Sequence, residues 1–251
     1  MRISQRSSTC SALIAAAVGA VLCAPLAAGP ADAATTTPKL RASAFQFMLT
    51  FDHRESLKTG TRVVDASGHG HAGVVMTHGG RITAKPGVSR RAAQFPPKGR
   101  AIVQIANGKG LNPRHRSFVF GGALRVGAKH AVRGSNIVQK GFYNQAGGQY
   151  KLQLAAGGVP VCVVFGDAGR IKTVANRGVA NGHWHRVSCA RTPTGVVVWI
   201  DGRRAGSTAG LTGRIANDAP INIGGKKVTA GNKQFRGRVD NVYMRFVPTS
   251  R

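Results

Sequence analysis

Residues 182–202 read GHWHRVSCARTPTGVVVWIDG and carry the strongest fold signal in the chain. From Val196 to Ile200 every second side chain points the same way in an extended strand. Val196, Val198 and Ile200 therefore face a core, and Val197 and Trp199 face outward. Asp201-Gly202 is a residue pair preferred in two-residue type I′ hairpin turns. The stretch therefore predicts an antiparallel strand that turns sharply and returns through residues 203–207.

Outside this hairpin, short runs rich in Val, Ile, Phe and Thr alternate with clusters of Gly, Pro, Asn and Asp, and helical periodicity is nearly absent. This alternation of strand-forming runs and turn-forming clusters is typical of a many-stranded antiparallel protein. So many short strands predict an all-β domain of two stacked sheets, each with one buried face. The further expected strands are 45–51, 72–77, 101–105, 117–126, 136–140, 150–154, 161–165, 171–175, 183–190, 221–223 and 238–246.

Four segments together resemble the signature of one domain family. Besides 182–202 they are DASGHGHAG (65–73), NIVQKG (136–141) and FRGRVDNV (235–242). In this order and spacing they are similar to laminin-G-like domains of the concanavalin A-like lectin/glucanase group. The resemblance covers about residues 45–247 and implies a two-sheet antiparallel jelly-roll sandwich, usually extracellular and often a binding module. Some relatives are glycosidases or lyases, so the fold alone does not decide the function.

The N-terminal region has the pattern of a secretory signal peptide. Arg2 and Arg6 precede an apolar run over 13–22, and the small residues ADAA (31–34) follow. The apolar run is too short to span a bilayer. We therefore expect cleavage after Ala33 or Ala34, a secreted protein that does not span the membrane, a flexible segment over 35–44 and a laminin-G-like domain over 45–251.

The chain is strongly basic, with 36 Lys and Arg against 8 Asp and Glu. Loss of residues 1–34 would leave 34 against 7, a net charge of +27. Such a field attracts anionic partners, among them acidic polysaccharides, teichoic acid, nucleic acid and anionic lipid. The charges are spread along the sequence, so an adaptation for solubility is the competing interpretation. No nucleic-acid-binding motif is present, and specific recognition of nucleic acid is not expected.

Aromatic residues make up only 6% of the chain, fewer than the aromatic strip of a binder of long neutral glycans would require. This composition favours an extracellular glycan or another anionic polymer as the ligand. Aromatic side chains on an exposed sheet face or its rim would stack on sugars, and basic side chains would meet anionic groups. The candidates are Trp199, Tyr143, Tyr150, Lys140, Lys151 and Arg203.

The cysteines predict one disulfide. Cys10 and Cys23 leave with the signal peptide, which makes Cys162 and Cys189 the remaining pair in an exported protein. Neither has a neighbouring partner at zinc-finger spacing. We expect the bridge to connect neighbouring strands joined by a hairpin-like excursion.

Catalysis is not expected. Glycosidases of this architecture need two carboxylates, and Glu55 would be the sole glutamate after cleavage. Residues 140–145, KGFYNQ, superficially resemble a strand of alginate lyases, so a polysaccharide lyase acting on acidic polymers is one alternative. Charge-driven binding to nucleic acid or to a cell surface is the other. The Arg-x-Glu and Gln-Ile-His segments of those lyases are absent from the sequence.

The family resemblance also implies one structural Ca²⁺ where the first and last strands meet. Asp240 lies in the final strand by motif, and Asp52 is the candidate that approaches it. Calcium takes six or more oxygen ligands, and the sequence identifies two residues. Turn capping or pairing with arginine is the alternative role for both carboxylates.

Overall fold

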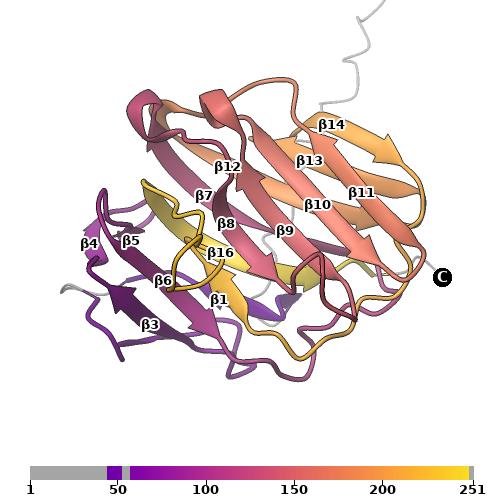
Figure 1. Ribbon diagram of the computed structural model, residues 1–251, viewed down its shortest axis with the longest axis horizontal. Helices are drawn as coiled ribbons and strands as arrows, with labels where there is room; N and C mark the ends of the chain where they lie inside the picture. The colour runs from indigo at the N-terminus through magenta and orange to yellow at the C-terminus, as the bar shows by residue number, and fades with distance from the viewer. Residues whose placement is uncertain (1–43, 53–56, 249–251) are drawn as a thin grey trace, which may run out of the picture. The chain divides into compact units, whose positions relative to one another are not determined.

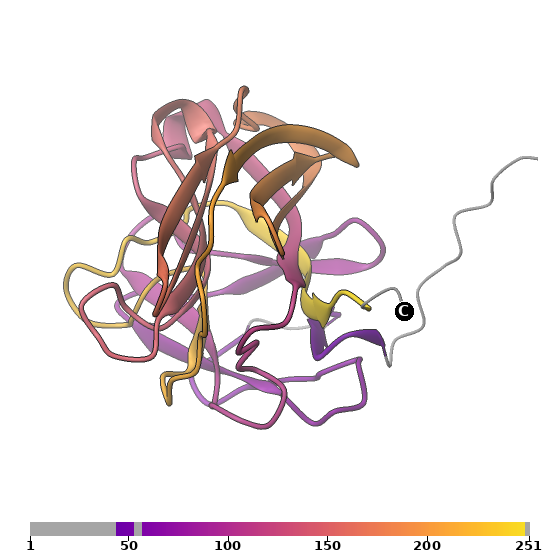
Figure 2. The same ribbon diagram turned by 90° about the vertical axis from the view of Figure 1, so that its right-hand side faces the viewer.

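The computed structural model describes residues 44–52 and 57–248. The predicted signal peptide, residues 35–43 of the expected flexible segment, and Glu55 lie outside this range. The described residues form two antiparallel eight-stranded sheets with two short 3₁₀ segments, Ala128–His130 and Ala156–Gly158. Figures 1 and 2 show the sheets as two layers. The prediction of a jelly-roll sandwich is confirmed. No helix of the described residues has the length and apolar character needed to cross a membrane.

Sheet I has the strand order β14-β13-β12-β7-β16-β5-β4, and β1 also pairs with β16. The first and last strands of the domain therefore lie side by side. The strands of sheet I are β1 (Phe47–Leu49), β4 (Thr83–Pro86), β5 (Arg91–Gln94), β7 (Phe118–Gly127), β12 (Asn181–Thr192), β13 (Gly195–Ile200), β14 (Arg203–Ala209) and β16 (Arg238–Phe246).

Sheet II has the order β11-β10-β9-β8-β15-β6-β3-β2. Its strands β8 to β11 lie in front in Figure 1. The strands of sheet II are β2 (Arg62–Val63), β3 (Gly73–His78), β6 (Arg100–Ile105), β8 (Ser135–Lys140), β9 (Gln149–Leu154), β10 (Pro160–Gly166), β11 (Gly169–Val174) and β15 (Ile221–Ile223).

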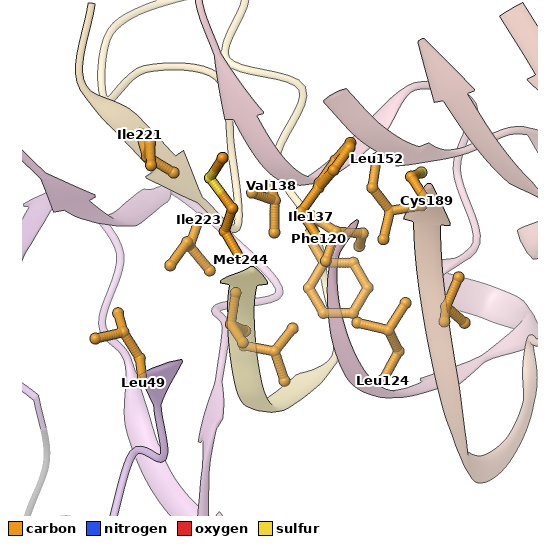
Figure 3. Packing of buried hydrophobic residues seen from close by; sticks show 14 of the residues in the cluster. Leu49, Phe120, Leu124, Ile137, Val138, Leu152, Cys189, Ile221, Ile223 and Met244 are labelled. Atoms are coloured by element: carbon orange, nitrogen blue, oxygen red, sulfur yellow. The ribbon is translucent and has the colours of Figure 1, made fainter. Parts of the chain in front are cut away.

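The core fills the space between the sheets, where alternate side chains of both inner faces meet (Figure 3). Tyr150 of β9 packs against Phe118 and Phe120 of β7, with ring centroids 5.3 and 5.0 Å away. All three rings are fully buried. Burial of each such side chain contributes about 1.5–3 kcal/mol, so this aromatic group is one of the strongest ties between the layers.

The predicted disulfide is confirmed, but its place in the fold differs from the expectation. Cys162 lies on β10 of sheet II and Cys189 on β12 of sheet I, with 5.7 Å between their Cα atoms. Both residues occupy core-facing positions and are fully buried. The bridge therefore joins the two sheets across the core, whereas we expected it to join neighbouring strands.

The hairpin in the segment 182–202 forms as predicted. Asp201 and Gly202 have φ angles of 54° and 76°, the two positive values that a type I′ turn needs. Val196, Val198 and Ile200 are fully buried.

Candidate functional site

The six predicted ligand residues do not form one site. Trp199 lies on the outer face of sheet I and is 36% exposed, and Arg203 begins the neighbouring strand β14. Tyr143, 70% exposed, follows β8 in the loop 141–148. Lys151 belongs to β9 of sheet II. The predicted residues on the surface are thus divided between two sheets and a loop.

Lys140 and Tyr150 are buried, and the prediction that they contact a ligand is wrong. Lys140 is opposite Tyr150 on one side and Ile221 on the other, so its side chain leaves the sheet toward the interior. There its Nζ donates hydrogen bonds to Asn107 Oδ1, at 2.8 Å, and to the Ala219 carbonyl. Burial lowers the pKa of the Lys140 amine to about 8, although the charge of Asp218 opposes the effect.

The hydroxyl of Tyr150 donates to the Leu111 carbonyl at 3.2 Å. Burial raises the pKa of this phenol well above its usual value. The hydroxyl of this buried phenol has its hydrogen-bond partner inside the core, and the ring offers no face to a ligand.

Lys151 lies in a polar row that crosses the outer face of sheet II. Residues directly opposite in an antiparallel pair share a face, and the strand register places Lys172, Val163, Lys151, Gln139, Asn222 and Gln104 in one row. The Gln104 amide donates to Asn222 Oδ1 at 2.9 Å, and Asn222 Nδ2 donates to the Lys226 carbonyl at 2.9 Å. These amides fix the β15–β16 connection against the sheet.

Five basic residues gather around the end of this row that holds Lys151 and Lys172. Partial burial, together with the positive charges of Arg170, Lys226, Lys172 and Lys233, lowers the pKa of Lys151 to about 8. We call Lys151 and these four neighbours the Lys151 cluster. Arg170 and Lys172 come from β11, and Lys226 and Lys233 come from the β15–β16 connection. The fold thus collects on one surface charges that are far apart in the sequence.

The described carboxylates serve other parts of the molecule. Asp65 accepts hydrogen bonds from the backbone of Met48, Ser67 and His71 and so organises the turn after β2. Asp201 pairs with Arg177 at 3.3 Å and His185 at 2.8 Å. These two are the ion pairs found among the described residues. The Lys151 cluster therefore has no carboxylate partner within the described part of the chain.

Asp240 and Asp52 approach each other at the β4–β5 turn, as expected for the first and last strands. Asp240 Oδ2 accepts a hydrogen bond from the Val88 N–H and Oδ1 accepts one from the Asn241 N–H, at 2.8 and 2.7 Å. Asp52 Oδ1 accepts from the Arg91 N–H at 3.1 Å. Burial, and to a smaller extent the charge of Asp52, raises the pKa of Asp240.

Both carboxylates thus hold the turn, which is the alternative role considered for them. The described residues contain no group of three or more His, Cys, Asp or Glu side chains arranged to hold a metal. A calcium ion here would need backbone carbonyls to complete its shell. The calcium site stays a prediction.

The second half of the domain matches a known family model. Residues 126–245 match the model of the concanavalin A-like lectin/glucanases superfamily. A sequence search of curated proteins found no relative.

Solved structures with the same fold include binding domains of bacterial proteins. The binding domain of Paraclostridial Mosquitocidal Protein 1 has a TM-score of 0.61 at 13% identity, over 83% of this chain and 50% of that one. Domain 4 of AbnA, an extracellular arabinanase from Geobacillus stearothermophilus in complex with arabinotriose, has 0.60 at 16%, over 80% and 92%.

A structure of botulinum neurotoxin type C, whose cell entry depends on two ganglioside molecules, has a TM-score of 0.57 at 12% identity, over 81% and 48%. The chain thus spans about half of the length of the toxin chains it matches. These likenesses show the fold. Together with the match of residues 126–245 to the model of the concanavalin A-like lectin/glucanases superfamily, they show a concanavalin A-like jelly-roll fold.

Proposed function

We propose that this protein is a secreted, non-catalytic binding module for acidic extracellular glycans, and that the Lys151 cluster on the outer face of sheet II is its contact surface. The observation that carries the proposal is the gathering of four cations around the half-buried amine of Lys151, whose pKa is about 8. Like charges at close range repel each other, and an anionic polymer laid across them removes that repulsion.

The surroundings of the cluster suit a glycan. Gln139 pairs with Lys151 across the strands and Asn222 pairs with Gln139, and both amides are buried and hydrogen-bonded, so they fix the sheet surface next to the cations. The arabinanase domain named above is in complex with arabinotriose, and cell entry of the botulinum neurotoxin depends on interaction with two ganglioside molecules, which supports a glycan as the partner.

Export is part of the proposal. The signal-like N-terminus lies outside the described residues, and the buried disulfide is the structural feature that accords with an oxidising compartment.

A polysaccharide lyase is the alternative function, and the position of its motif counts against it. β8 ends at Lys140, which points into the core, whereas Tyr143 lies in the following loop. The segment 140–145 therefore does not form one strand face that aligns a base and a neutralising cation. Formation of unsaturated products from polygalacturonate or alginate, followed by ultraviolet absorbance, would contradict the non-catalytic assignment.

The test is a binding panel of heparin, hyaluronate, polygalacturonate, dextran and duplex DNA at about 50 and about 500 mM salt. We expect an acidic polysaccharide to retain binding at the higher salt and Lys151→Met to weaken it at least tenfold. Lys85→Met, which removes an exposed lysine from β4 of sheet I, is the matched control. Binding that is equal for DNA and polysaccharides and disappears in salt would leave charge alone as the cause.

A further inference from the structure

A second cationic feature lies next to the Lys151 cluster. A pocket of about 410 Å³ is lined by Arg100, Arg133, Lys233 and Arg236, and its other described lining residues include no carboxylate. Arg100 begins β6 and Arg133 lies just before β8. These strands flank β15, and the connection that leaves β15 carries Lys233 and Arg236 back over them. We call this the arginine pocket.

The floor of the arginine pocket is rigid. Buried Gln234 accepts hydrogen bonds at Oε1 from the Ala101 N–H and from Asn232 Nδ2, both at 2.9 Å. Its Nε2 donates to the carbonyls of Gly224 and Phe235, also at 2.9 Å. Both polar atoms of this buried amide have partners, and these bonds tie the β15–β16 connection to the start of β6 and to the end of β15. The pocket is therefore formed before a ligand arrives.

One of the arginine pocket's guanidinium donors lacks a partner. Arg236 Nε is buried and has no acceptor among the described residues, whereas Arg100 Nε donates to the Val228 carbonyl at 3.0 Å. A buried donor left unpaired costs free energy, and the guanidinium cannot escape the cost by losing its proton. The Arg236 side chain also lines the pocket, so an anion held there would meet its positive charge.

We propose that the arginine pocket binds a tetrahedral oxyanion ester, phosphate or sulfate, carried on a sugar. A carboxylate is planar and is satisfied by one guanidinium fork, which would leave the other basic groups of the pocket unused. The oxygens of a phosphate or sulfate point in several directions and accept from arginines on different walls. The pocket volume also exceeds that of a bare ion and leaves room for the sugar.

This inference rests on the proposed function, since it names the substituent that the bound glycan presents. Lys233 lines the arginine pocket and also acts on Lys151 through its charge. The pocket therefore continues the Lys151 cluster, and a chain lying on the cluster would place one substituted sugar in the pocket.

The experiment is calorimetric titration of the full chain with glucose 6-phosphate, glucose 6-sulfate, glucuronate and glucose at matched ionic strength. We expect one or both esters to bind, and Arg133→Gln to weaken that binding about tenfold. Arg133 is exposed, so the variant keeps the fold, while Arg236→Gln removes the unpaired donor directly. Arg62→Gln, an exposed arginine on edge strand β2 of the same sheet, is the control.

The outcomes separate this inference from the proposed function. Polymer binding that depends on Lys151, with no ester binding or with equal loss in the Arg62 and Arg133 variants, overturns the arginine pocket alone. Glucuronate binding as tight as the esters overturns the tetrahedral preference. Ester binding that Arg133→Gln abolishes, in a protein that binds no polysaccharide, supports the pocket and overturns the proposed polymer function.

Discussion

Replacing Lys151 with methionine is predicted to stabilise the fold while it weakens ligand binding. The amine has a pKa of about 8 in the folded protein, against its usual 10.5, because burial and four neighbouring cations disfavour its charge. At about 1.4 kcal/mol for each pKa unit, the charged amine costs at most about 3.5 kcal/mol. Lys151 retains contact with solvent, which screens the cost, and we expect a gain of about 1 kcal/mol.

Chemical and thermal denaturation across pH test this prediction. The cost of the charged amine is fully present below pH 8 and disappears as pH rises toward 10.5, because the unfolded chain holds this proton more tightly. The wild type should therefore gain stability relative to Lys151→Met between these values. At pH 7 and low salt the variant should melt about 2–4 °C higher, and salt should narrow the difference.

Lys85→Met removes one positive charge from the other sheet and serves as the control. The difference in stability between Lys85→Met and the wild type should not change over this pH window. A Lys151→Met variant that melts lower than the wild type, or whose stability runs parallel to it from pH 7 to 10.5, would refute the reasoning.

Three further predictions concern the fold and the predicted calcium site. Replacing Cys162 and Cys189 together with alanine should lower the free energy of unfolding by about 3–4 kcal/mol in urea titrations, since the bridge closes a loop 27 residues long; an unchanged midpoint would show that the bridge is not formed. A chelator should lower the melting temperature if Ca²⁺ joins Asp52 and Asp240, and Asp240→Asn should abolish that response; no response in the wild type would leave the two carboxylates as turn-holding groups. Tyr150→Phe keeps the packed ring and loses its bond to the Leu111 carbonyl, so urea titration should show a loss of about 1 kcal/mol with unchanged glycan binding, and weakened binding would count against its core assignment.

Most strands were predictable from the sequence because one face of each is buried. The strands β7 to β13, β15 and β16 follow alternating or continuous runs of β-branched and aromatic residues, and their bounds agree with the expectation within a few residues. The strands β2, β4 and β5 were missed, and β2 is only two residues long. The sequences of β4 and β5, TAKP and RAAQ, are poor in β-forming residues, and the pairing of these strands with each other and of β5 with β16 maintains them.

The direction of individual side chains was harder to predict than the strands. Lys140 and Tyr150 are opposite each other on the inner side, but a lysine is rarely assigned to a core, and its partners at Asn107 and Ala219 lie on remote loops. Trp184 is only partly buried and lies outside the core cluster of the described residues, although a tryptophan is more often a core anchor. A shift in strand register between Asn181 and Trp184 changes which face the residues there occupy.

The distribution of charge in three dimensions favours a ligand over solubility as the reason for the basic residues. Charges kept only for solubility cost least when they are far apart, and the sequence alone shows such a spread. The fold instead brings Arg170, Lys172, Lys226 and Lys233 around Lys151 and leaves the carboxylates in turns elsewhere. That arrangement carries a cost of repulsion in the free protein. An anionic partner converts this cost into binding free energy, and so the same residues should limit stability and determine affinity.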